Sequence, residues 1–240
     1  MLFDLSSSRR RRSVVRVVYG FLALLMAASL FFVINGGVFQ GNNSSGSGGS
    51  GNGNQSSLLK KQLTSATAET KRNPKSAKAW GDVVSARYQM AQAGSKTDAK
   101  TGTTTYNAAG KAQAKKAAAA YTKYHAVAKG KFDQAISQEA ARMDAVAGNN
   151  AAAGSAWQDV AGTNTGGSKP YLCIALAETA AKNNKLAGSA IGKAMSMTPK
   201  IQRYTLVSQY QKAVSGAIGK KGKPVKPVPA IAAKSLSAYC

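Results

Sequence analysis

Apolar residues occur in two patterns: one continuous run near the N-terminus and then a long series of short amphipathic segments. The run, residues 17–34, consists mainly of Val, Leu, Phe and Ala, and it lacks the polar stripe of a helix buried in a soluble domain. At about 1.5 Å per residue, its roughly 18 residues span about 27 Å, close to a hydrocarbon core of about 30 Å. The pattern predicts a single transmembrane helix.

The amphipathic series fills residues 58–216 and predicts an all-α domain. Apolar residues recur at spacings of three and four, alanine is abundant, and Gly, Asn or Pro interrupts the pattern at intervals. Short helices joined by short loops favour stacked helical hairpins. The predicted helices are 57–71, 76–93, 106–128, 132–147, 150–161, 171–182, 186–197 and 199–215, with a polar insertion at 94–105.

Two further segments offer little to bury. Residues 35–57 are nearly all Gly, Asn and Ser, which predicts a flexible linker. Residues 217–240 combine lysines with several prolines, which predicts an extended, disordered tail. This tail serves equally well as a polyanion-binding segment or as a solubilising end. Its candidate polyanion contacts are Lys220, Lys221, Lys223 and Lys226.

Charge predicts the orientation in the membrane. Arg9, Arg10, Arg11, Arg12 and Arg16 precede the apolar run, whereas the linker after it carries no charge. By the positive-inside rule, residues 1–16 lie in the cytoplasm and the helical domain lies outside the plasma membrane. A cleaved signal peptide has the same polarity, but its apolar region is shorter and ends in a small-x-small site. A retained anchor is therefore favoured.

The net charge is +24, of which +20 falls in residues 58–240. Such a surface binds polyanions in a salt-dependent way, for example anionic wall polymers, lipid head groups or nucleic acid. Nucleic acid is disfavoured because the aromatic residues fall at helical spacing and are not interleaved with the basic ones. The alanine-rich domain, the polar linker and the scarcity of acids are typical of a bacterial protein.

Catalytic chemistry has few candidate residues. His125 is the only histidine, no pair of acids lies beside it at helical spacing, and no phosphate-binding Gly loop precedes a helix. Cys173 and Cys240 are too few for a disulfide framework or a zinc site. Cys173 lies in an apolar helical run and is predicted to be a small core residue. Cys240 lies on the predicted tail, which leaves a disulfide with a second chain open. We expect no enzyme activity, metal or cofactor.

A shift of 34 residues aligns small residues with small ones, for example Ala141 with Ala175 and Ala153 with Ala187. Small side chains at a helix crossing let two backbones approach closely. Residues 169–199 resemble a tetratricopeptide repeat. The matching positions are Tyr171, Ile174 and Ala175 in the first helix, Ala187, Ile191 and Ala194 in the second, and the terminal Pro199.

The resemblance weakens toward the N-terminus. Glu178 stands where the family usually has an aromatic residue, the copy at 137–165 matches less well, and the copy at 77–129 needs about 20 extra residues. The resemblance implies a tetratricopeptide-like α-solenoid of about three degenerate repeats over 58–216. An alanine-rich bundle without repeat homology remains the alternative.

The family binds peptides in a groove lined by the first helix of each hairpin. Carried over by register, the groove candidates are Lys78, Ser85, Tyr88, Gln138, Arg142, Lys169, Leu172, Leu176 and Thr179. The Lys and Asn clamp for chaperone C-termini is missing. The expected function is a membrane-anchored scaffold for an unidentified protein or peptide. The alternative is an electrostatic binder of anionic cell-envelope polymers or lipid head groups.

Overall fold

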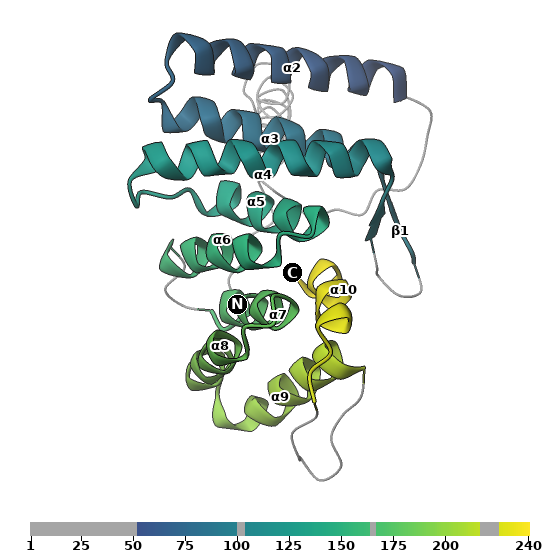
Figure 1. The fold of residues 1–240 in the computed structure, drawn as a ribbon, viewed down its shortest axis with the longest axis vertical. Helices are drawn as coiled ribbons and strands as arrows, with labels where there is room; N and C mark the ends of the chain where they lie inside the picture. The colour runs from purple at the N-terminus through teal and green to yellow at the C-terminus, as the bar shows by residue number, and fades with distance from the viewer. Residues whose placement is uncertain (1–51, 100–103, 164–166, 217–225) are drawn as a thin grey trace, which may run out of the picture. The chain divides into compact units, whose positions relative to one another are not determined.

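The computed structural model describes residues 52–99, 104–163, 167–216 and 226–240 (Figure 1). In these ranges the protein is all-α apart from one short hairpin of strands, which confirms the predicted fold class. The helices are α2 (Asn52–Arg72), α3 (Ala77–Ala93), α4 (Ala108–Ala128), α5 (Gln134–Ala147), α6 (Asn150–Thr163), α7 (Lys169–Ala180), α8 (Asn184–Met197), α9 (Lys200–Ser215) and α10 (Pro229–Tyr239).

Two elements differ from the expectation within residues 52–216. Helix α2 begins at Asn52, so the last part of the predicted linker is helical. The polar insertion contains an antiparallel pair, β1 (Ser95–Thr97) and β2 (Thr104–Tyr106). The hydroxyls of Thr97 and Thr104 lie 3.0 Å apart across the pair. Threonine favours extended backbone, so the polar insertion pairs as strands instead of forming a loop throughout.

Polar caps explain why several helices begin where the sequence predicts. The Asn107 side chain accepts a hydrogen bond from the Gly110 amide at 2.8 Å, and Asp133 accepts from the amides of Ala135 and Ile136. These bonds satisfy amides that have no partner within the helix. Gly148 ends α5 with a positive φ of 84°, a conformation that glycine adopts without a steric penalty.

Each helix from α2 to α8 packs against the next one along the chain, and α3 also packs against α5, as α7 does against α9 (Figure 1). The interfaces consist largely of alanine. Fully buried examples are Ala140, Ala141, Ala153, Ala156 and Ala175. Small residues at a helix crossing allow the two backbones to approach closely.

The predicted disordered tail is wrong over residues 229–239, which form α10. Ala232 and Leu236 of this helix are buried in the main core, and α10 packs chiefly against α7, α9 and α5. Pro229 stands at the first helical position, where proline is tolerated. Ala232, Leu236 and Cys240 recur every fourth residue, so they form one apolar stripe. The lysine and proline content of the segment obscured this stripe.

Within the described residues, no helix has the length and apolar character needed to cross a membrane. The predicted transmembrane helix 17–34 and the predicted cytoplasmic segment 1–16 lie outside them.

Candidate functional site

Two polar contacts join α3 to α5 on the side where the sequence predicts a groove. Ser85 Oγ donates to Glu139 Oε2 at 2.5 Å, and Arg142 Nη1 donates to the Tyr88 hydroxyl at 3.1 Å. The two residues from each helix are three positions apart, so they lie on one face of that helix. Burial raises the pKa of Glu139, while the hydrogen bond from Ser85 opposes that rise. The structure therefore brings three predicted groove residues, Ser85, Tyr88 and Arg142, to one place.

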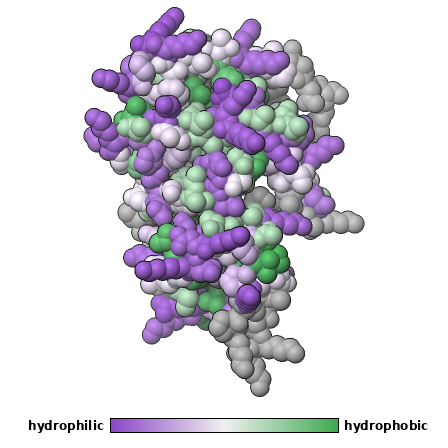
Figure 2. Space-filling view, in the orientation of Figure 1, coloured by the Kyte–Doolittle hydropathy of each residue, from purple (hydrophilic) through white to green (hydrophobic). Residues whose placement is uncertain are grey.

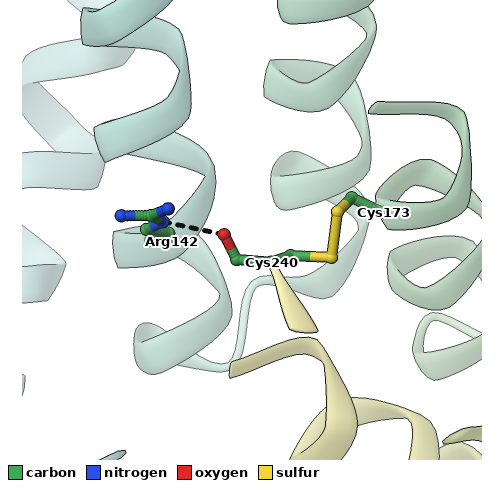
Figure 3. Close-up of a disulfide and its surroundings, with 3 residues drawn as sticks. All are labelled: Arg142, Cys173 and Cys240. Atoms are coloured by element: carbon green, nitrogen blue, oxygen red, sulfur yellow. Dashed lines mark hydrogen bonds between the residues drawn. A yellow bond between two sulfur atoms is a disulfide. The ribbon is translucent and has the colours of Figure 1, made fainter. Parts of the chain in front are cut away.

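The C-terminal residue Cys240 lies between α5 and α7 (Figure 3). Its sulfur forms a disulfide with Cys173 of α7, with the two Cα atoms 5.8 Å apart. Its backbone oxygen accepts a hydrogen bond from Arg142 Nε at 2.8 Å. Arg142 therefore connects α3, α5 and the end of α10. We call the sides of α5 and α7 that carry Arg142 and Cys173 the docking face.

The structure shows the partner of each cysteine, which the sequence left open. Cys173 is fully buried, as expected, but it is bonded and is not a free core thiol. Cys240 is held within its own chain and is not available to a second one. The two cysteines are 67 positions apart in the sequence, so only the tertiary structure shows that they meet. The signal that sequence reasoning missed is the apolar stripe that ends at Cys240.

Two groove candidates on α7 are inaccessible. Leu176 is fully buried in the core cluster that also contains Ala232 and Leu236 of α10. Thr179 is also buried, and its hydroxyl lies 2.7 Å from the Ala175 backbone oxygen and 2.8 Å from the Tyr210 hydroxyl. The sequence-based expectation that Leu176 and Thr179 face an open groove is therefore wrong for the structure with α10 in place.

The other candidates are at least partly exposed. Lys78 is exposed and pairs with Asp82 at 2.8 Å, a contact that raises the pKa of Lys78. Gln138 and Leu172 are half-buried, and Lys169 is exposed at the start of α7. Among the polyanion candidates, Lys226 is exposed, whereas Lys220, Lys221 and Lys223 lie outside the described residues.

A second surface, a pocket of about 490 Å³ between α2, α3 and α4, was not predicted. Its apolar lining includes Trp80, Val83 and Ala120, and its charged lining residues are Lys71, Arg87, Lys116 and Lys123. No carboxylate lines it. Three helices contribute to this pocket, so only the folded structure brings its residues together.

Figure 2 shows that hydrophilic residues cover much of the face in view, with hydrophobic residues in scattered patches.

Arg87 is the least solvated cation of this pocket. Its Nη1 atom donates to the Gln113 side-chain oxygen at 3.0 Å, so its partner is a neutral amide. Burial lowers the pKa of Arg87. Within the described ranges, neither Arg87 nor the three pocket lysines has a carboxylate partner. A partly buried cation without a counter-ion favours the approach of an anionic group.

A polar cluster surrounds His125, the only histidine. Its Nε2 atom lies 3.4 Å from Asp159 Oδ2, and the Tyr121 hydroxyl donates to the same carboxylate at 2.7 Å. Ser137 Oγ lies 3.0 Å from the Tyr121 hydroxyl, but Ser137 is fully buried. A buried hydroxyl cannot reach a substrate, so this cluster joins α4, α5 and α6 and does not form a nucleophilic site.

The chain matches no protein-family profile, no curated protein and no solved structure. The resemblance to tetratricopeptide repeats remains a prediction from the residues named above.

Proposed function

We propose that residues 52–240 form a tetratricopeptide-like scaffold that binds a segment of another protein. In this proposal the predicted helix 17–34 anchors the scaffold, with the helical domain outside the plasma membrane. The observation that carries the proposal is the position of α10, which packs against α5, α7 and α9. The helices between them in the sequence, α6 and α8, make little contact with α10. Helices α5, α7 and α9 stand in the first-helix positions of successive hairpins, which is the side that binds peptides in the family.

The contacts of α10 support this function because they are those of a bound segment. Apolar side chains, Ala232 and Leu236, enter the core cluster, while Arg142 donates to a backbone oxygen at the end of the helix. A helix laid into an apolar groove is a common mode of peptide recognition. Toward α3, the partly exposed Gln138 and the exposed Lys78 extend the same side of the protein.

Site-specific photo-crosslinking tests the scaffold function. A photoreactive residue at Gln138 is compared with one at Ser189, an exposed position on α8, in the full chain on intact cells. We expect a defined protein adduct from position 138 and none from position 189. Equal adducts at both positions, or none at either, contradict binding on this side. External protease should also digest residues 58–240 on intact cells, and protection of these residues would overturn the proposed orientation.

The cationic pocket favours a second candidate function, electrostatic binding of anionic envelope polymers or lipid head groups. Lys71, Arg87, Lys116 and Lys123 supply positive charge around an apolar floor. Binding of this kind weakens steeply with salt, whereas recognition of a peptide by apolar contacts is less sensitive.

Charge reversal at the pocket tests this second function. Lys116→Glu with Lys123→Glu is compared with Lys185→Glu and Lys193→Glu on α8, which change the net charge equally. Vesicles with and without anionic lipid are sedimented with each protein at low and at high salt. Weaker binding only for the pocket pair supports the function. Equal weakening in both pairs shows that net charge alone causes the binding.

A further inference from the structure

We propose that the docking face accepts a helix of a partner protein in place of α10, and that reduction of the Cys173–Cys240 disulfide makes this exchange possible. This inference rests on the proposed scaffold function and names the partner chemistry and the control of that site. The partner is a short amphipathic helix with a small residue and a leucine one turn apart. Its last turn presents a backbone oxygen to Arg142.

The partner chemistry follows from the contacts of α10. Ala232, Leu236 and Cys240 are buried, whereas Ala230, Ala238 and Tyr239 are exposed. The face therefore takes up one stripe of a helix, with small residues at each end of the stripe and a leucine in the middle. Long side chains are not needed for this contact except at the central position.

Arg142 recognises the end of the bound helix. The last carbonyl groups of an α-helix have no partner within the helix and need a donor from elsewhere. Arg142 supplies this donor to the backbone oxygen of Cys240 at 2.8 Å, and the hydrogen bond from Arg142 to Tyr88 holds the guanidinium in place. Because the contact is to backbone, any helix that ends at this point satisfies it. Arg142 therefore favours a bound helix whose last turn reaches this point, and it places little demand on the sequence of that helix.

Helix α10 depends on its docking site for its own structure. It has 11 residues, and an isolated helix shorter than about 12–15 residues is marginal in water. Its first turn is tied to α9 by a hydrogen bond from the Val228 amide to the Val214 backbone oxygen at 2.7 Å. The disulfide adds a covalent connection at the other end. Because both ends of α10 are held, a partner helix cannot displace it.

Reduction removes one of these two restraints. Both cysteines are buried, Cys240 at 7% exposure and Cys173 fully, so a dithiol reductant reaches the sulfur of Cys240 when the last turn of α10 opens locally. The Cys173–Cys240 bond breaks, Cys173 leaves as a thiolate and takes up a proton, and a mixed disulfide forms between Cys240 and the reductant. The second thiol of the reductant displaces Cys240 as a thiol, so the reductant ends as a disulfide. Two electrons pass to the protein, and α10 is then held only by non-covalent contacts.

A peptide probe tests whether the face accepts a helix from outside. The probe is a fluorescent peptide of residues 226–240 that carries Cys240→Ser, and its anisotropy is measured with the full chain purified in detergent. Three proteins are compared: the oxidised wild type, the Cys173→Ser/Cys240→Ser chain, and that chain with Leu236→Glu. The last variant is needed because the chain's own α10 competes at an effective concentration of about millimolar.

We expect no binding to the oxidised chain, weak binding to the double-serine chain and at least tenfold tighter binding to the Leu236→Glu variant. Adding Arg142→Gln should weaken this binding about tenfold, since a hydrogen bond from a charged donor is lost. A probe that itself carries Leu236→Glu should not bind. Equal binding of the probe to the oxidised chain and to the Leu236→Glu variant would overturn the proposal. A Leu236→Glu variant that keeps its helical circular dichroism but does not bind would overturn it as well.

If the Leu236→Glu variant does not fold, hydrogen exchange on the reduced wild type decides the question. Faster exchange confined to 229–239 supports release of α10, and unchanged protection contradicts it. Dimerisation of the reduced chain by exchange of α10 would show that the occupant is a second copy and not a partner. Gln138 is partly exposed with α10 in place, so crosslinking at this position does not require reduction of the disulfide. It can therefore succeed when the probe fails, and it separates failure of this inference from failure of the scaffold function.

Discussion

Replacing Cys240 by serine should lower the free energy of unfolding by about 4 kcal/mol. The disulfide closes a loop between residues separated by 67 positions. The loop-closure expression, with about −2.1 − 1.5R ln n cal/mol/K, gives roughly 4 kcal/mol at 25 °C for a loop of this length. The reason is entropic, because the unfolded chain without the disulfide gains conformations that the closed loop forbids.

The loss should appear first in α10. Without the disulfide, α10 is held by the burial of Leu236 and Ala232, by the hydrogen bond from Arg142 to the backbone oxygen of residue 240 and by the turn at Val228. These contacts are few for an 11-residue helix, in which the backbone of every residue must be ordered. We therefore expect α10 to open separately from α2–α8.

Urea unfolding followed by circular dichroism, combined with hydrogen exchange read by mass spectrometry, measures both effects. Ala238→Ser, at an exposed position of α10, is the matched control and should change stability by less than about 0.5 kcal/mol. Cys240→Ser should expose 229–239 to exchange while α3–α7 stay protected. A variant that unfolds within about 1 kcal/mol of the wild type, with α10 as protected as before, would refute the reasoning that the disulfide holds this helix.

Four further substitutions test other parts of the structure. Burial raises the pKa of Asp144 to about 6, above the unfolded value of about 3.9, so the wild type loses stability as pH rises through this interval. Asp144→Asn should remove about 3 kcal/mol of that decline, measured by urea unfolding at pH 4 and pH 7. Parallel pH profiles for the two proteins would contradict this prediction. Gly148→Ala should destabilise the protein by about 1 kcal/mol because φ at this position is positive. Gly192→Ala, where the added methyl group meets open space within α8, should stabilise the protein by up to about 1 kcal/mol. Thermal melting that shifts both variants in the same direction would refute the conformational argument. Tyr121→Phe should cost about 1–3 kcal/mol in chemical unfolding because it removes the hydrogen bond to Asp159, and an unchanged midpoint would show that water replaces the hydroxyl.

The helices of residues 58–216 were predictable because local signals agree with each other. Asn107 and Asp133 cap helices where the apolar period begins, and Gly148 ends one where the period stops. The 34-residue spacing of alanines also has a physical counterpart, since Ala141, Ala153 and Ala175 are fully buried. These features depend on neighbouring residues or on one repeating contact, both of which a single sequence carries.

The candidate site was only partly predictable because its decisive contact joins distant residues. Ser85, Tyr88 and Arg142 were assigned to one face from register, and the structure brings them together. The sequence did not reveal that α10 covers α7, because lysines and prolines precede a stripe of only three buried positions. Composition describes the average tendency of a segment, whereas docking depends on which side of it is apolar.

The disulfide also determines how a mechanical load would pass through the protein. A pull applied between α2 and residue 240 would run from Cys173 directly to Cys240, so the chain between them would carry no tension while the bond is intact. Reduction would place this stretch under load. At about 3.3–3.6 Å per extended residue, it would add roughly 220–240 Å of contour length. In single-molecule pulling, the oxidised protein should therefore extend less than the reduced protein by that amount. Residues 174–239 would extend under force only after the disulfide is reduced.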